Sequence, residues 1–314
     1  MNYDIGIDVG GTKVLAGVVD TQGKIVEKIR RETPIEGGSA LTSVISEMAN
    51  ELKDKYEVEG IGVCSAGFFA PDRRSIIANP NIANWNGVEL AKELESRIGR
   101  PVVLENDANA AAWGERQFGA GAKANELVML TIGTGLGGGL ITDGKIVRGS
   151  RGAAAEFGHM RAVPDGHLCG CGLRGCYEQY ASGTALMRHA REAISASPDL
   201  SRSLLARGNG TVDGVTGEHL TSAAKDGDPV AVAAFNTTGH WIGALVATLE
   251  AALDPAKVVI GGGVIAAGEI LLKPIRESMS QLSLFRGRRS APELVAATLG
   301  NDAGLIGVAN LARY

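Results

Sequence analysis

The sequence is poor in aromatic residues and has little excess charge of either sign. Phe, Trp and Tyr make up 4% of the 314 residues, too few for the stacked rings that bind single-stranded nucleic acid. The 31 basic and 35 acidic residues give a net charge of −4, which argues against a basic face for nucleic acid. No apolar run approaches the ~20 residues that cross a bilayer, and no basic region opens the chain as in a signal peptide. We therefore expect a cytoplasmic protein that binds neither nucleic acid nor membranes.

Hydrophobic residues make up 45% of the chain and glycine is abundant, with 44 residues. This composition is typical of a folded protein with a core, and the length predicts two domains. A run of three strands opens the chain and recurs after residue 126, which suggests two related α/β halves. We expect strands at 3–9, 14–20, 24–31, 58–65, 102–105, 126–132, 138–142, 145–147, 258–260 and 294–297, helices at 40–55, 88–98, 107–118, 183–195, 222–225, 229–253 and 264–282 with a last one up to 312, and an irregular segment at 198–217.

Two turns rich in Gly and Thr each follow one strand and lead into another, at Gly10–Lys13 and at Gly133–Gly138. The second fits the G-x-G-x-x-G dinucleotide pattern, but that site requires a helix after the turn, so we reject it. Such turns can direct backbone N–H groups and hydroxyls at phosphate oxygens; the alternative is two ordinary hairpins. Lys13 either contacts a phosphate or faces outward on its strand.

Two further features fit a nucleotide. Asp8 ends the first strand just before the first turn, where a carboxylate can hold Mg²⁺ beside phosphates; the alternative is a solvated turn residue. Gly262 and Gly263 lie between a strand and a helix. Their backbone either lies flat under an adenosine or lets the helix and strand pack closely.

The segment Glu105-Asn106-Asp107 joins a buried strand to a helix, the place where open α/β sheets bind ligands. We expect the helix N-terminus to lower the pKa of Asp107 and keep it ionised. It can then accept a proton from a hydroxyl that attacks phosphorus. Either Asp107 or Asn106 caps the helix. Asn81 is a candidate ligand for a substrate hydroxyl, or a turn residue.

Three of the four cysteines lie within eight residues of one another, with a histidine shortly before them. One imidazole and three thiolates fill the tetrahedral shell of a structural zinc ion. The predicted ligands are His159, Cys169, Cys171 and Cys176, with Cys64 outside the shell.

Two carboxylates flank the predicted zinc segment, Glu156 before it and Glu178 after it. Zinc would hold both in fixed places, where they can accept hydrogen bonds from sugar hydroxyls; the alternative is two exposed loop charges. Because the glycine turns lie elsewhere in the chain, we expect the zinc segment to affect sugar binding much more than nucleotide binding.

Five segments together resemble the ROK family of repressors and sugar kinases, and the likeness runs from Met1 to the last helix. They are Asp8–Lys13, Glu105–Asp107, Gly133–Gly139, Glu156–His159 and Cys169–Glu178. Within the family the chain is most similar to the bacterial ATP-dependent glucokinases. The repressor branch carries an N-terminal helix-turn-helix, for which this chain has no room before its first strand.

The resemblance implies an actin-like (ribonuclease H-like) fold of two α/β domains around a cleft, a small one at 1–118 plus 302–314 and a large one at 119–301. It implies ATP-dependent phosphorylation of the glucose 6-hydroxyl, with Mg²⁺ and structural Zn²⁺, by a homo-oligomer (dimer or tetramer). Asp107 matches the catalytic base. Asn81, Asn106, Glu156, His159 and Glu178 match sugar ligands, and Gly10, Gly11, Thr12, Thr134 and Gly135 match phosphate-turn positions.

Three kinds of alternative remain open at this point. The sugar can be N-acetylglucosamine, N-acetylmannosamine, mannose or fructose. Polyphosphate can replace ATP as the donor, although no long basic track is evident. A sugar-sensing regulator without catalysis is the alternative of another class, against which the presence of Asp107 argues.

Overall fold

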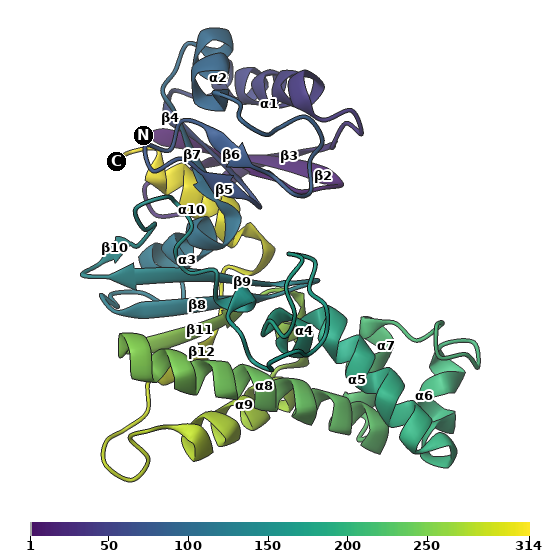
Figure 1. Cartoon of the computed structure of the whole chain (residues 1–314). Coiled ribbons are helices and arrows are strands. Elements are labelled where there is room, and N and C mark those ends of the chain that lie inside the picture. Colours follow the sequence, from purple (N-terminus) through teal and green to yellow (C-terminus); the bar gives the residue numbers. More distant parts are fainter. Residues whose placement is uncertain (1) are drawn as a thin grey trace. The chain divides into compact units, whose positions relative to one another are not determined.

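The computed structural model describes residues 2–314, which divide into two compact units (Figure 1). Unit 1 contains the chain up to Met129, Gly139–Ala155 and Ala297–Tyr314. Unit 2 contains Leu130–Gly138 and Glu156–Ala296. The domain boundaries predicted after residues 118 and 301 stay a prediction.

Unit 1 is built on a five-stranded sheet with the strand order β3-β2-β1-β4-β7. Strand β2 is antiparallel to both β1 and β3, whereas β4 is parallel to β1 and β7 is parallel to β4. The strands are β1 Tyr3–Val9, β2 Lys13–Val19, β3 Ile25–Glu32, β4 Val58–Ser65 and β7 Val102–Asn106, with a separate hairpin of β5 Phe68–Phe69 and β6 Ile76–Ala78.

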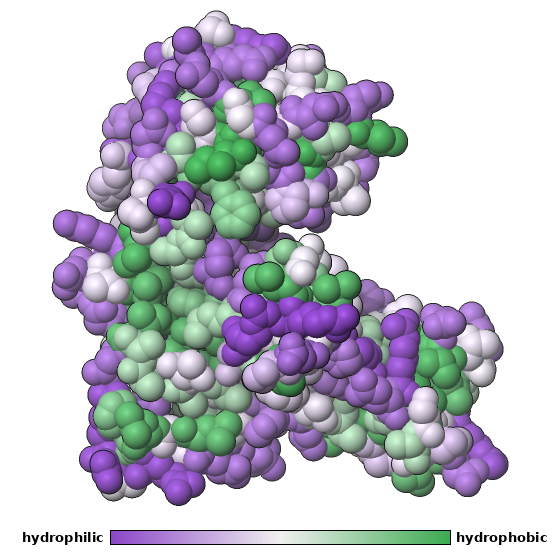
Figure 2. Space-filling view, viewed as in Figure 1, coloured by the Kyte–Doolittle hydropathy of each residue, from purple (hydrophilic) through white to green (hydrophobic). Residues whose placement is uncertain are grey.

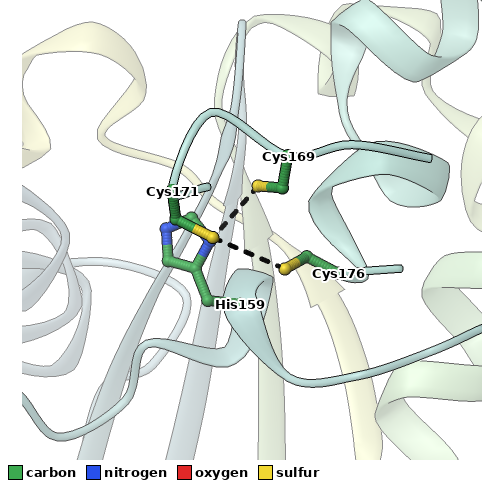
Figure 3. Close-up of side chains that lie close together, drawn as sticks. All are labelled: His159, Cys169, Cys171 and Cys176. Atoms are coloured by element: carbon green, nitrogen blue, oxygen red, sulfur yellow. Dashed lines mark hydrogen bonds between the residues drawn. The ribbon is translucent and has the colours of Figure 1, made fainter. Parts of the chain in front are cut away.

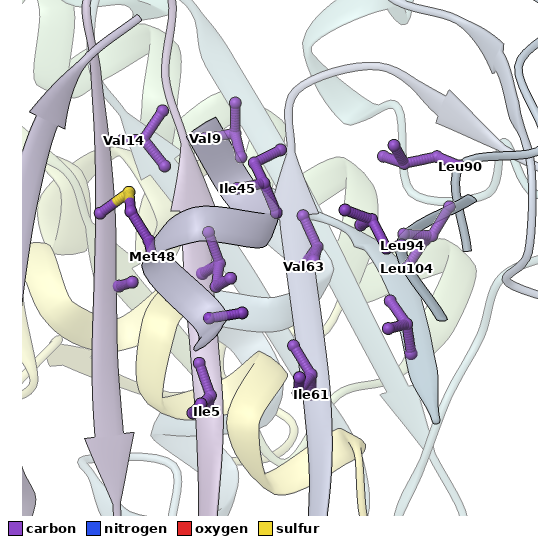
Figure 4. Packing of buried hydrophobic residues seen from close by; sticks show 14 of the residues in the cluster. Ile5, Val9, Val14, Ile45, Met48, Ile61, Val63, Leu90, Leu94 and Leu104 are labelled. Carbon is purple, nitrogen blue, oxygen red and sulfur yellow. The ribbon is translucent and has the colours of Figure 1, made fainter. Parts of the chain in front are cut away.

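The two faces of this sheet are covered by different helices. On one face, α1 (Gly38–Lys53) and α2 (Leu90–Ile98) bury aliphatic side chains against the strands. Figure 4 shows Ile45 and Met48 of α1 above the strands, and Leu94 of α2 beside Leu104. The outward surface over α1 and α2 is mostly hydrophilic (Figure 2), as amphipathic helices require.

The other face carries α3 (Asp107–Phe118) and α10 (Ala303–Leu311). Helix α10 lies so close to β4 that a Cβ placed on Gly62 would come within 2.0 Å of the Val308 carbonyl oxygen. Residues near the C-terminus therefore complete the core of the unit that the N-terminus begins.

The second sheet has the order β10-β9-β8-β11-β12 and repeats the plan of the first, as the recurring strand pattern predicts. Strands β11 and β12 are parallel. The bounds are β8 Leu127–Ile132, β9 Leu136–Thr142, β10 Lys145–Ile146, β11 Lys257–Gly261, β12 Glu293–Ala296, α4 Glu178–Ala181, α5 Gly183–Ala196, α6 Arg202–Arg207, α7 Gly217–Lys225, α8 Pro229–Leu253 and α9 Glu269–Leu282.

Three predictions of local structure are wrong. The segment 198–217 is not irregular throughout, because it contains a 3-10 helix at Pro198–Ser201 and helix α6. Helix α7 begins at Gly217, directly after its cap Thr216, and not at the predicted residue 222. The helix predicted from 264 begins as a 3-10 helix at Gly263–Ala267 and becomes α-helical only after Gly268.

Helix α8 is capped by Asp228 and begins with Pro229, as predicted. Judged by length and composition alone, it is the one helix among residues 2–314 that could cross a bilayer. Of its apolar window, 61% is buried inside the fold, which is typical of a core helix.

Candidate active site

In unit 1 three adjacent parallel strands end close together: β1 is followed by the turn Gly10–Lys13, β4 ends at Ser65 and β7 ends at Asn106. Asp8, Cys64 and Glu105 are register partners across these strands. Because register partners point to the same face of a sheet, their side chains form a row on the face that α3 and α10 cover. The structure thus brings Asp8 close to the segment that carries Asp107.

Asp107 is the first residue of α3, and Asn106 is its N-cap. The Asn106 side-chain oxygen accepts hydrogen bonds from Ala108 N at 2.9 Å and Asn109 N at 3.1 Å, while its amide nitrogen donates to the Gly67 carbonyl at 3.2 Å. The alternative left open by the sequence is settled: Asn106 caps the helix, and Asp107 projects from its first turn.

The expectation that the helix N-terminus lowers the pKa of Asp107 is wrong. Desolvation raises the pKa of this carboxyl, and the hydrogen bond from Ala108 N opposes the rise by less. Asp107 is nevertheless an exposed residue of unit 1, so solvent limits the shift. A higher pKa favours a general base, since it binds the abstracted proton more firmly.

Asp8 is half-buried at the end of β1, and its pKa is raised to about 6. Desolvation is the largest cause, and the second is the negative charge of Asp107. The Cys64 thiol donates to Asp8 Oδ1 at 3.8 Å and partly offsets both. A divalent cation would relieve the repulsion between two such carboxylates, so the residues present fit Mg²⁺.

The turn Gly10–Lys13 is held at its base and exposed at its tip. Gly10 N donates to the Lys13 carbonyl at 2.9 Å, and Thr33 Oγ1 donates to the Gly10 carbonyl at 2.7 Å. Gly11, Thr12 and Lys13 are exposed, and nothing lies within 4 Å of a Cβ placed on Gly11. The backbone at the tip is thus accessible to a ligand.

Asn81 is exposed on a loop that its neighbour Asn79 ties to the sheet. The Asn79 amide donates to Ser65 Oγ at 3.1 Å and to the Ala66 carbonyl at 2.7 Å, and its oxygen accepts from Asn81 N. Sequence reasoning missed this anchoring role, because it depends on contacts 13 and 14 residues away.

Sequence reasoning also missed Arg148, the ion-pair partner of Glu105. Arg148 Nε donates to Glu105 Oε2 at 2.7 Å, and the Glu105 side chain is 3% exposed. Asn109 Nδ2 donates to the other carboxylate oxygen at 3.2 Å. This pair fixes the chain after β10 beside the segment that carries Asp107.

In unit 2 the second glycine turn lies beside the Gly261–Gly263 turn. A Cβ placed on Gly262, whose φ is +87°, would come within 2.4 Å of the Ile132 carbonyl oxygen, just before Gly133. Gly262 and Gly263 are exposed, and open space lies above Gly263. The structure therefore brings together Thr134, Gly135, Gly262 and Gly263.

The four predicted zinc ligands converge in unit 2 (Figure 3). One ligand atom from each of His159, Cys169, Cys171 and Cys176 lies within 4.8 Å of the others. Cys169 Sγ is 3.6 Å from His159 Nδ1, and Cys171 Sγ is 3.7 Å from Cys176 Sγ. A tetrahedron with Zn–S bonds of about 2.3 Å has edges of about 3.8 Å, so the donor set and its spacing fit zinc.

Cys64 lies in unit 1 beside Asp8 and outside this cluster, as predicted. Glu156 precedes the 3-10 helix that carries His159, and Glu178 begins α4 directly after the cysteines. The Glu178 carboxylate accepts from the Cys169 thiol at 3.5 Å through Oε1 and from Leu136 N at 3.1 Å through Oε2. The zinc segment therefore contacts the second glycine turn, which lies 42 residues away in the sequence; the expectation that it affects sugar binding much more than nucleotide binding is not tested by this contact.

The chain matches the model of the ROK family over residues 4–314. It is 44% identical over 313 residues to a glucokinase of Streptomyces coelicolor, covering 100% of this chain and 98% of that protein. It is 30% identical over 313 residues to an N-acetylmannosamine kinase of Yersinia pestis, covering 100% and 99%. A crystal structure of a ROK family glucokinase from Streptomyces griseus with glucose and AMPPNP superposes with a TM-score of 0.88 at 45% identity, covering 99% of both chains.

This protein belongs to the ROK family. The predicted fold class, the actin-like ATPase fold with two α/β domains, is confirmed by the likeness to ROK glucokinases over the whole chain. The residue roles expected from the family pattern are not tested by these likenesses, and they stay predictions.

Proposed function

We propose that this chain is a glucokinase that transfers the γ-phosphoryl group of ATP to the 6-hydroxyl of glucose. The proposal depends on the arrangement at the carboxyl end of β7. There Asn106 caps α3, which leaves the Asp107 carboxylate projecting from the first turn, and the pKa of this carboxyl is raised. The 44–45% identity to glucokinases, one of them solved with glucose and AMPPNP, supports glucose and ATP as the substrates.

In this mechanism Asp107 accepts the proton of the 6-hydroxyl while the hydroxyl oxygen attacks the γ-phosphorus, and the bond from the γ-phosphorus to the bridging oxygen breaks to release ADP. The exposed backbone of the turn at Gly10, Gly11 and Thr12, and that at Thr134 and Gly135, donates to the phosphate oxygens. Asp8 would hold Mg²⁺, which neutralises charge on those oxygens when it is bound. Lys13 adds positive charge to the turn at Gly10–Lys13.

The sugar ligands in this proposal are Asn81, Asn106, Glu156, His159 and Glu178. His159 turns Nδ1 toward Cys169, which leaves Nε2 for a sugar hydroxyl. Zinc would be bound by His159 and the three cysteines; it takes no part in the reaction, because protein ligands fill its tetrahedral shell. Gly262 and Gly263 lie under the adenosine.

A coupled assay tests the function directly. Glucose, mannose, fructose, N-acetylglucosamine and N-acetylmannosamine are compared by kcat/KM at fixed Mg·ATP, and polyphosphate is compared with ATP as the donor. We expect glucose with ATP to give the highest kcat/KM. Sugar binding without turnover by any donor would instead indicate a non-catalytic regulator. The predicted cytoplasmic location and homo-oligomer, dimer or tetramer, stay predictions; light scattering tests the latter.

A further inference from the structure

One side of the second glycine turn is held by Glu178, which closely follows the zinc ligands in the sequence. Leu136 N donates to Glu178 Oε2, and a Cβ placed on Gly135 would come within 2.4 Å of the same oxygen. Glu178 stands two residues after the zinc ligand Cys176. The carboxylate therefore lies directly against the turn.

The other side of the turn is held by the N-terminus of α5. Gly183 N donates to the Gly133 carbonyl at 2.7 Å, and Thr184 Oγ1 donates to the Thr134 carbonyl at 2.7 Å. A Cβ placed on Gly183 would come within 2.6 Å of the Gly133 carbonyl oxygen. Only a residue without a side chain permits this approach of the two backbones.

We infer that Glu178 and Thr184 are positioning residues for the nucleotide, because together they fix the conformation of the turn Gly133–Leu136. This inference rests on the proposed function, in which that turn binds ATP phosphates. Binding to a turn that is already ordered avoids the entropic cost of ordering it. Gly133 N donates to the Gly135 carbonyl and Leu136 N donates to Glu178, so the N–H groups of Thr134 and Gly135 are those that the proposed function assigns to a phosphate.

Glu178 has a second contact that joins the zinc segment to this turn. Its Oε1 accepts from the Cys169 thiol while its Oε2 accepts from Leu136 N. The zinc segment therefore orders both the turn and the proposed sugar ligands near it. Disordering the zinc segment should weaken nucleotide binding as well as sugar binding.

The decisive variant is Thr184→Val, since Thr184 is exposed, its hydroxyl donates to the Thr134 carbonyl, and it is not among the proposed zinc or sugar ligands. The matched control is Thr237→Val, which removes an exposed threonine hydroxyl that donates to a backbone carbonyl at 3.1 Å within α8. Calorimetry measures the Kd of Mg·AMPPNP and, separately, the Kd of glucose for each protein. These equilibrium constants do not depend on turnover.

We expect Thr184→Val to weaken AMPPNP binding about fivefold, the effect of one hydrogen bond of about 1 kcal/mol, with glucose binding within about twofold of wild type. Glu178→Ala should weaken both. AMPPNP binding by Thr184→Val that equals that of Thr237→Val and wild type would overturn the inference and leave the proposed function standing. A wild-type protein that binds no AMPPNP would overturn both.

Discussion

Arg148 Nε donates a 2.7 Å hydrogen bond to Glu105 Oε2, and the Glu105 side chain is 3% exposed. Because the charge of Glu105 is taken out of water, removing its partner leaves an uncompensated carboxylate. We expect Arg148→Met to lower the free energy of unfolding by about 3 kcal/mol. The double variant Glu105→Gln/Arg148→Met should regain part of that loss, since the remaining amide carries no charge. Urea unfolding measures both.

A matched control is the exposed ion pair of Arg202 and Asp199, with side chains 82% and 92% exposed. Arg202→Met should leave stability unchanged, because exposed pairs contribute little. Equal effects of Arg148→Met and Arg202→Met would contradict the burial argument.

Asp107→Asn should reduce kcat by about 10²–10⁴-fold, the usual contribution of general-base assistance. Glucose binding should stay within about tenfold of wild type, since the amide still offers a hydrogen-bond acceptor. Steady-state kinetics and calorimetry separate the two effects. Asp213→Asn, at a side chain 95% exposed, is the control. A wild-type kcat in Asp107→Asn would show that another group accepts the proton.

Asp8 predicts a pH dependence of stability. Its carboxyl keeps a proton in the folded state up to a pKa of about 6, against 3.8 ordinarily. Between these values the folded state binds more protons than the unfolded chain, so stability falls as pH rises through this window. The full cost above pH 6 is at most about 3 kcal/mol.

Asp8→Asn removes that cost. In buffers without divalent cations, its stability relative to wild type should rise between pH 4 and pH 7 and then stay constant. Urea unfolding across this range measures the difference, with Asp213→Asn as a control that should show no such rise. A flat difference for Asp8→Asn would mean that the carboxyl titrates normally.

The zinc prediction compares two cysteines from different units. Metal analysis should find one zinc per chain in Cys64→Ser and none in Cys176→Ser, because only Cys176 belongs to the cluster. Zinc loss should weaken both glucose and AMPPNP binding, since Glu178 contacts the turn at Leu136. Full glucose affinity in a folded, zinc-free Cys176→Ser protein would refute the proposed positioning role of zinc.

Sequence patterns predict the strands of the two large sheets, the zinc ligands and the strand–turn–strand form of both glycine turns, because each depends on neighbouring residues. They do not predict the short hairpin of β5 and β6. They do not predict the partner of Glu105, which lies 43 residues away, or the contact of Glu178 with Leu136, 42 residues away. The pKa of Asp107 was predicted in the wrong direction for the same reason. The helix N-terminus is visible in the sequence, whereas the packed atoms that desolvate the carboxyl come from the fold.

The position of α10 has a consequence for synthesis on the ribosome. The face of β4 at Gly62 is covered by Val308, and unit 1 includes Ala297–Tyr314, whereas unit 2 ends at Ala296. All of unit 2 is therefore translated before unit 1 has its last helix. Until nearly the whole chain is made, the emerging N-terminal sheet lacks α10 over the part of its face at Gly62. A nascent chain stalled before residue 297 should thus be sensitive to protease in its first half, and a chaperone that binds exposed strands should act there.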